Sequence, residues 1–264
     1  MSQTVELAPM TGNEKFQDVE YTIANKESVS LHIGAKPSIW DHVFIVVAEF
    51  IGTATLLFLS CMGTTMGIQG DISTMQVSFN TGLAVMAVIQ MFGHISGAHV
   101  NPVVTMSAFI LNEITLVQVP LYVISQIFGS LAGVGLQVMV TPRRYIDVTG
   151  HGVCVPTPHS DITHLQAFGV EILLTTILIF SICACWDRRN SDKLDSVALR
   201  IGLVVGVLNL AAAAYTGASM NPVRTFGPAV WGNDYNAHWV YWIAPTIGSL
   251  IATFTYKYIF LRKK

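Results

Sequence analysis

Charged residues are scarce in this 264-residue chain, where they make up 11% of the sequence and hydrophobic residues make up 52%. Soluble domains carry roughly 25% charged residues, so this chain has too few to cover a water-facing surface. The formal net charge is only −2. No basic patch is interleaved with aromatic residues, and we therefore predict no nucleic-acid partner.

Cysteine is scarce as well. The four cysteines are Cys61, Cys154, Cys183 and Cys185. They show no metal-like spacing with histidine, and three lie in apolar segments as small hydrophobic residues, so we predict neither a disulfide framework nor a metal site. His94 and His99 have no cysteine or carboxylate at ligand spacing, and Ser96 has no base partner. The sequence thus predicts no enzyme and no cofactor.

The amino-terminal stretch lacks the basic start and apolar core of a signal peptide. Its polar composition predicts that residues 1–38 form a disordered cytoplasmic tail. The rest of the chain is predicted to be a single membrane domain at 39–261, followed by a short cytoplasmic end at 262–264.

Long apolar segments dominate the remainder. Six are long enough to span a bilayer, which takes about 20 residues. They lie at about 43–65, 77–96, 115–139, 165–185, 198–216 and 239–260. Two further apolar pieces, at 102–111 and 222–231, have about half that length and can enter a membrane without crossing it. The predicted fold class is an all-α membrane protein with six transmembrane helices and two re-entrant half-helices.

Lysine and arginine are unevenly placed around these segments. With the amino terminus inside, Arg143 and Arg144 fall outside, and the basic residues of the other loops and of both termini fall in the cytoplasm. Because cytoplasmic loops carry the excess of positive charge, both termini are expected in the cytoplasm of a multi-pass cell-membrane protein.

The chain contains an internal repeat. Its clearest parts are SGAHVNPVVT at 96–105 and TGASMNPVRT at 216–225, which are 120 residues apart. The two copies cover about 43–139 and 165–260. Each copy has three crossings, an odd number, so the second is inverted relative to the first. Inverted repeats bring their special segments together near the bilayer midplane.

Asn-Pro opens each short apolar piece, as Asn101-Pro102 and Asn221-Pro222. Asparagine is a good helix N-cap and proline suits the first turn, so each half-helix should begin there with its positive dipole end at the midplane. That potential repels cations and protons, whereas a neutral molecule can accept hydrogen bonds from the asparagine amides. The residues just before each asparagine must be non-helical and line a watery cavity.

Glu49 and Glu171 occupy equivalent places in the first helix of each copy. A carboxylate inside a membrane helix is costly unless it is paired. We expect each to accept hydrogen bonds from unpaired N–H groups of a re-entrant loop, and His99 to brace the first loop. A proton relay is the alternative role for the two carboxylates.

With these motifs, and with HWVYWIAP near the carboxyl end, the chain resembles the aquaporin, or major intrinsic protein, family over residues 40–260. The resemblance implies an hourglass pore in each protomer of a homotetramer in the lipid bilayer, passing water and sometimes small neutral solutes. Family members usually have Asn-Pro-Ala twice, whereas the third positions here are Val103 and Val223. Both asparagines remain, so we expect the pore to function.

The resemblance also implies a four-residue selectivity filter, placed by spacing from the two asparagines. Its positions are Thr81, Asn209, Ala218 and Arg224. Water-selective relatives usually carry Phe and His at the first two, so this filter should be wider and admit glycerol and urea with water. Phe79 should not restore the constriction, because two residues along a helix rotate a side chain by about 200°. Thr225 after the pore arginine, Ala229 and the Tyr241-Trp242 pair resemble the water-channel branch rather than the bacterial glycerol channels. The chain therefore resembles a water-channel scaffold with an opened filter, as in the insect entomoglyceroporins.

Other interpretations stay open at this point. Asn209 and its neighbours could close the filter and leave a water-selective channel, or Asn209 could serve only as a polar contact between helices. The scaffold could also serve adhesion or signalling without transport. A secondary transporter would need an intramembrane acidic residue free of a structural task, and none is evident.

Overall fold

The computed structural model describes residues 38–65, 72–146 and 154–261. These residues contain helices and no strand. The long helices are α2 (Ile39–Met62), α3 (Thr74–Ser96), α5 (Gln118–Val140), α6 (His164–Trp186), α7 (Val197–Thr216) and α9 (Val240–Thr255). The short ones are α4 (Pro102–Ile110) and α8 (Pro222–Gly232). This order confirms the predicted fold class. The predicted tail at 1–38 and end at 262–264 lie, except for Ser38, outside the described residues.

Within the described part of the chain, five helical stretches are long and apolar enough to cross a membrane. They are α2, α3, α5, α6 and the run Arg188–Thr216, in which the 3-10 turn η2 (Arg188–Ser196) precedes α7. The sixth predicted span, at 239–260, is found as α9 followed directly by the π-helical turn η3 (Tyr256–Phe260). A second short 3-10 turn, η1 (Arg143–Tyr145), follows α5.

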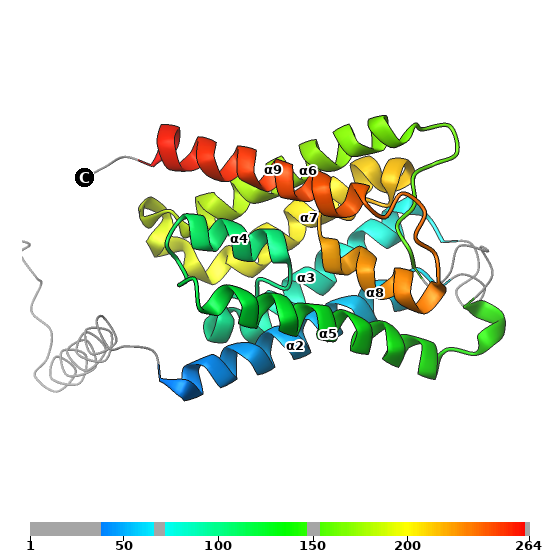
Figure 1. The fold of residues 1–264 in the computed structure, drawn as a ribbon, viewed down its shortest axis with the longest axis horizontal. Helices are drawn as coiled ribbons and strands as arrows, with labels where there is room; N and C mark the ends of the chain where they lie inside the picture. The colour runs from blue at the N-terminus through cyan, green and yellow to red at the C-terminus, as the bar shows by residue number, and fades with distance from the viewer. Residues whose placement is uncertain (1–37, 66–71, 147–153, 262–264) are drawn as a thin grey trace, which may run out of the picture. The chain divides into compact units, whose positions relative to one another are not determined.

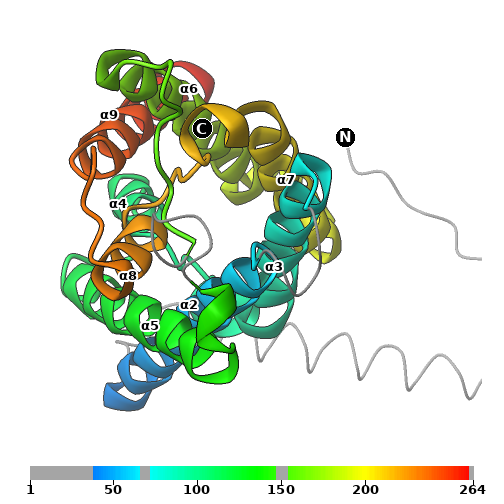
Figure 2. The ribbon, with the colours of Figure 1, turned by 90° about the vertical axis from the view of Figure 1, so that its right-hand side faces the viewer.

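From His42 onward the described residues form one compact unit, in which the two short helices lie between longer ones. Figure 1 shows α4 and α8 one after the other along the long axis, with α5 on one side and α9 on the other. Figure 2, turned by 90°, shows the long helices arranged as a ring around the molecule's middle. Extensive contacts join α3 with α7, α6 with α9, and α5 with α8.

The two copies meet at equivalent residues. A Cβ atom added to Gly82 in α3 would lie 2.5 Å from the carbonyl oxygen of Gly202 in α7, and one added to Gly202 would lie 2.8 Å from that of Gly82. Only glycine permits so close a backbone approach. Because these two residues correspond in the repeat, their contact lies near the axis that relates the copies, as expected for an inverted repeat.

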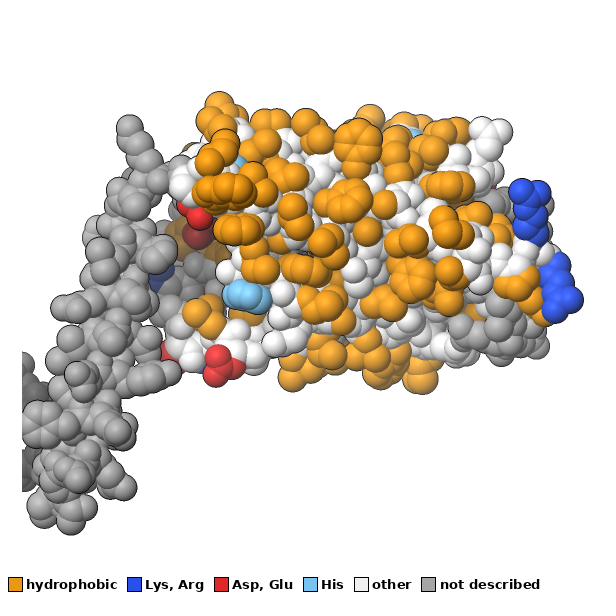
Figure 3. Space-filling model, turned by 90° about the horizontal axis from the view of Figure 1, so that it is seen from below, with side chains coloured by type: hydrophobic (Ala, Val, Ile, Leu, Met, Phe, Trp, Pro, Cys, Tyr) orange, Lys and Arg blue, Asp and Glu red, His pale blue; other side chains and the backbone are white. Residues whose placement is uncertain are grey.

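The flank of the helical unit is apolar. Large hydrophobic side chains are exposed on the long helices, among them Phe44, Phe79, Phe128, Leu173 and Val207. Figure 3 shows such side chains over most of one flank, between an end with Lys and Arg and an opposite end with Asp and Glu. An apolar surface this extensive suits the hydrocarbon region of a bilayer, where it would not have to contact water.

The structure corrects one prediction from the sequence. Cys61, near the end of α2, forms a disulfide with Cys154, and their Cα atoms are 5.3 Å apart. Cys183 and Cys185 are free. The expectation of no disulfide was wrong because the paired residues are 93 positions apart in sequence. The fold places Cys154, in the segment before α6, beside the end of α2.

Candidate functional site

Each half-helix begins at its asparagine, as expected from the Asn-Pro pairs. Asn101 and Asn221 have extended backbones, with φ of −157° and −152°. Their side-chain oxygens accept hydrogen bonds from the backbone N–H of Val103 and Val223, both at 3.1 Å. Proline follows in the first turn, where no backbone donor is needed. The positive ends of α4 and α8 therefore meet near the two asparagines.

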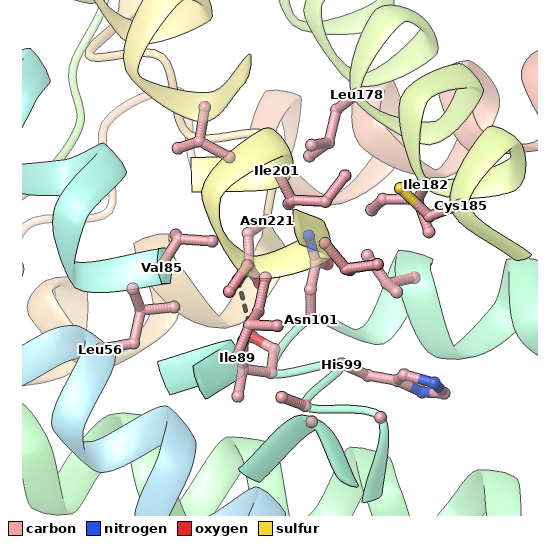
Figure 4. A pocket seen from close by; sticks show the side chains of 18 of the residues that line it. Leu56, Val85, Ile89, His99, Asn101, Leu178, Ile182, Cys185, Ile201 and Asn221 are labelled. Carbon is pink, nitrogen blue, oxygen red and sulfur yellow. Dashed lines mark hydrogen bonds between the residues drawn. The ribbon is translucent and has the colours of Figure 1, made fainter. Parts of the chain in front are cut away.

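The two asparagines also tie the copies together. The amide nitrogen of Asn101 donates to the carbonyl of Met220 at 3.0 Å, and that of Asn221 donates to the carbonyl of Val100 at 2.8 Å. Figure 4 shows the two side chains beside one another in the cavity. An amide group carries two N–H bonds. Each asparagine uses one N–H bond to donate to the other copy, so its second N–H is left for a molecule in the cavity.

The loops before the asparagines hold unusual backbone conformations. Positive φ angles occur at Gly97, Ala98 and Val100 and at Gly217, Ala218 and Met220. The left-handed region is rare for residues other than glycine and is strained for a branched side chain such as Val100, with φ of 43°. Such strain persists only where the surroundings over-determine it, and it clusters at functional sites.

The first loop is held by Glu49. One oxygen of its carboxylate accepts from the hydroxyl of Ser96 at 2.6 Å and the N–H of His99 at 2.9 Å. The other accepts from the N–H of Val100 and the side-chain amide of Gln126, both at 2.8 Å. The buried carboxylate thus satisfies two backbone donors that the strained loop leaves without a helical partner.

Glu171 holds the second loop in the same way. One oxygen accepts from the hydroxyl of Thr216 at 2.6 Å and the N–H of Ser219 at 3.0 Å, and the other accepts from the N–H of Met220 at 2.8 Å. These contacts match the bracing role expected for both glutamates. Both carboxylates are fully buried among donors, which leaves a proton-relay role without support.

His99 lies behind the first loop rather than among metal ligands. Its Nδ1 lies 3.2 Å from the hydroxyl of Thr105, and its ring stacks on Tyr122 with centroids 4.6 Å apart. In the second copy a hydroxyl pair takes this place, since the Ser219 and Thr225 oxygens are 2.6 Å apart. Among the described residues no group of three or more His, Cys, Asp or Glu side chains could hold a metal ion.

A cavity of about 660 Å³ lies alongside the two re-entrant loops. It touches both Thr81 and His94 on α3, which are 13 residues apart and hence separated by about 20 Å along the helix axis. Both asparagines and both loops line it. Much of the remaining wall is aliphatic, with Val85, Ile89, Leu178, Ile182 and Ile201 in view in Figure 4. The cavity wall thus combines aliphatic surface with the hydrogen-bonding groups of the asparagines and the loops.

Three of the four predicted filter residues line the cavity: Thr81, Ala218 and Arg224. Asn209 is not among the lining residues. It is 1% exposed and accepts a hydrogen bond from the Ser78 hydroxyl at 3.2 Å, the interhelical contact considered as its alternative role. Phe79 is 57% exposed on the outer face of α3, so no aromatic ring from this turn reaches the cavity.

Among the described residues, Arg224 is the only arginine that lines the cavity, and it is 9% exposed. Its Nη1 donates to the carbonyl of Cys154 at 3.1 Å. Its Nε is buried and has no hydrogen-bond partner within the described residues.

Several supporting residues were not among those predicted from the sequence. Tyr122 donates to the carbonyl of Ser96 at 2.6 Å, and Tyr241 donates to that of Thr216 at 2.7 Å. The two tyrosines are 119 residues apart, so the repeat carried a signal for them. Gln126 has no such counterpart, and the role of Cys154 depends on a backbone carbonyl, which no residue type reveals.

Comparisons with known proteins agree with this geometry. A family model described as major intrinsic protein matches residues 37–256. The chain is similar to aquaporin-4 of Rattus norvegicus, with 35% identity over 243 residues, covering 89% of this chain and 73% of that protein. It is also similar to the lens fiber major intrinsic protein of Ovis aries, with 36% identity over 222 residues, covering 84% and 82%.

The fold has a solved counterpart. The X-ray structure of the aquaglyceroporin from Plasmodium falciparum matches with a TM-score of 0.72 over 83% of this chain and 97% of that one. The sequence identity is 24%, so this likeness bears on the fold alone.

Proposed function

The chain belongs to the major intrinsic protein family and is therefore a membrane channel and not an enzyme, and we propose that it passes water, glycerol and urea while excluding ions and protons. The carrying observation is Thr81, a small polar side chain that lines the cavity together with Arg224 and Ala218. A wide filter does not reject solutes by size. Glycerol and urea can also exchange hydrogen bonds with the threonine hydroxyl and the arginine.

Ion exclusion rests on two features that act together. Arg224 places a positive charge in the cavity wall, and the amino ends of α4 and α8 add two positive dipole ends beside the asparagines. The cavity's apolar walls offer a cation little to replace its hydration shell. A neutral solute avoids both penalties.

The experiment compares water, glycerol and urea flux in proteoliposomes by stopped-flow light scattering. Thr81→Phe should lower glycerol and urea permeability at least tenfold and keep water permeability within about threefold of wild type. A tenfold change corresponds to only about 1.4 kcal/mol in the free-energy barrier. The structure buries Asn209 against Ser78, so Thr81→Phe is the decisive change, and adding Asn209→His tests whether that position contributes to the filter. Phe79→Leu, two residues away on the outer face, is the matched control and should change no flux.

Two results would contradict the proposal. Glycerol and urea entering wild-type proteoliposomes no faster than empty vesicles would establish a water-selective channel instead. Unchanged glycerol flux in correctly inserted Thr81→Phe, Asn209→His protein would show that these residues are not in the filter. Assignment to the entomoglyceroporin branch stays a prediction that depends on these two positions and on the flanking residues Thr225, Ala229, Tyr241 and Trp242.

The assembly and orientation form part of the proposal. We place the channel in the cell membrane as a homotetramer with both termini in the cytoplasm. The disulfide supports this orientation, because Cys61 and Cys154 then lie at the outer, oxidising side. Protease cleavage of an amino-terminal tag in sealed cells tests it, since cleavage from outside would reverse the assignment.

A further inference from the structure

The segment that leads into α6 is fastened beside the candidate filter at three points. Cys154 is joined to Cys61 in α2 by the disulfide. Pro156 packs on Gly217, where an added Cβ would lie 2.9 Å from the proline Cα. The N–H of His159 donates to the carbonyl of Tyr215 at 2.9 Å. The disulfide is the one covalent link among these three. It is attached to Cys154, the residue whose carbonyl contacts Arg224.

Cys154 itself supplies that partner. Its carbonyl is the one hydrogen-bond acceptor that Arg224 contacts in the part of the chain that the structure describes. The backbone of Cys154 has a φ of 48°, a conformation that is uncommon for residues other than glycine and that persists when neighbouring contacts enforce it. The side chain of the same residue is tied to α2, so the covalent link acts directly on the carbonyl that holds the arginine.

We propose that the Cys61–Cys154 disulfide is a positioning element that sets the solute selectivity of the channel by holding the Cys154 carbonyl against Arg224. This inference rests on the proposed function. With the disulfide intact, the guanidinium is held at the cavity wall. When the disulfide is opened, the Cys154 carbonyl is no longer held against the guanidinium, and the arginine donors turn toward molecules in the lumen.

A guanidinium that reaches into the lumen narrows the filter. Glycerol is larger than water, so its flux falls more, and the ratio of glycerol to water permeability decreases. A loss of folded protein would lower both fluxes in proportion and leave the ratio unchanged. The ratio therefore distinguishes positioning of Arg224 from a merely structural role of the disulfide.

The disulfide can be opened in the assembled protein by a trialkylphosphine applied from outside. The phosphine gives two electrons to the S–S bond and becomes the phosphine oxide with an oxygen from water, and the two protons of that water convert the sulfurs to thiols. Labelling of the denatured protein should find two free thiols, Cys183 and Cys185, before treatment and four after it.

The test measures both permeabilities in proteoliposomes of the full chain. Treating the wild type with phosphine should lower the glycerol-to-water ratio at least threefold, and Cys61→Ser, Cys154→Ser protein should show the lowered ratio without treatment. Phosphine should have no further effect on that double variant. Cys183→Ala, which removes a free cysteine away from the filter, should respond like the wild type.

A double-mutant cycle with Arg224→Val isolates the mechanism, since coupled residues give non-additive effects. In that background, opening the disulfide should leave the ratio unchanged. An unaltered ratio in the reduced wild type with four labelled thiols would overturn the proposal, and so would an equal decrease with and without Arg224. If phosphine cannot reach the disulfide, the glycerol-to-water permeability ratio of the Cys61→Ser, Cys154→Ser variant provides the test.

The proposed solute permeability could fail independently. If the wild type passes water but neither glycerol nor urea, the positioning role is scored on water flux per inserted protein. A decrease in water flux when the disulfide is reduced supports the positioning role if the decrease is absent in Arg224→Val. An unchanged water flux overturns that role.

Discussion

The two re-entrant loops are built on one scaffold and differ in what they present to the cavity. Both have a buried glutamate, a left-handed backbone, and an asparagine that caps a half-helix and donates to the other copy. Yet Val104 in the first half-helix corresponds to Arg224 in the second, and His99 corresponds to Ser219. The repeat has kept the residues that fold the loops, whereas a charge in the cavity occurs in one copy only.

This difference separates two kinds of requirement. The strained loops need equivalent hydrogen bonds in both copies, because each contains buried N–H groups that no helix satisfies. The proposed filter uses one positive charge, that of Arg224, which lies in the second copy only. Substitutions at the shared positions should therefore affect stability in both halves alike, and substitutions at the unshared ones should affect selectivity.

The largest effect is expected from removing a shared carboxylate. Glu171→Ala leaves two backbone donors and a hydroxyl buried without an acceptor, at about 1–3 kcal/mol each. Glu49→Ala should cost a similar amount. Thermal unfolding in detergent should show a large decrease of the midpoint for both, with a smaller decrease for the Glu→Gln variants. A wild-type midpoint for either alanine variant would contradict equal roles in the two copies.

Arg224→Val should have the second-largest effect. It gives the second half-helix the residue type that the first has at the equivalent position, Val104. Losing the charge in the cavity wall should raise cation conductance and proton leak at least tenfold, equivalent to about 1.4 kcal/mol at the barrier. Planar-bilayer recording and a pH-sensitive dye in vesicles measure the two. Arg200→Gln removes a positive charge outside the cavity lining and serves as the control. Leak at the wild-type level would disprove the barrier role of Arg224.

Gln126→Leu tests a brace found in one copy only. Gln126 donates to Glu49 and to the hydroxyl of Thr105, and the corresponding residue of the second copy is Pro245. Its loss should cost about 1–3 kcal/mol in free energy of unfolding and leave the glycerol-to-water ratio unchanged. A changed ratio would place Gln126 among the selectivity residues.

The smallest effect is expected from Val103→Ala and Val223→Ala, which restore the usual family motif. Both side chains are buried and neither lines the cavity, so their methyl groups pack against protein. Each substitution should cost about 1–2 kcal/mol in stability. Water and glycerol permeabilities, measured side by side, should stay within about twofold of wild type. A larger change in one copy would show that the motif's third position acts on the permeant.

Much of the site followed from sequence because its signals are local or repeated. Asn-Pro fixes a helix start at Asn101 and Asn221 by simple capping chemistry, and the structure begins both half-helices there. The pairing of each glutamate with its loop could be expected because a buried carboxylate needs donors. Thr81 could be separated from Phe79 by helix rotation alone, and the structure agrees.

Other features depend on distances that the sequence does not encode. Sequence spacing predicted the position of Asn209 along its helix axis. The direction of its side chain depends on how α7 is rotated against α3, and there it accepts a hydrogen bond from Ser78. The disulfide joins residues from α2 and the segment before α6, and nothing in their neighbourhoods marks them as partners. Whether Asn209 takes part in selection stays a prediction.

The crossed asparagine bonds have a consequence for synthesis. They join Asn101 to Met220 and Asn221 to Val100, pairs separated by 119 and 121 residues. Contacts so distant in sequence form late, because the intervening chain must be in place first. A ribosome that has made only the first copy has therefore produced a loop whose partner does not yet exist. The centre of the channel is completed at the end of biogenesis, and a truncated chain cannot form it.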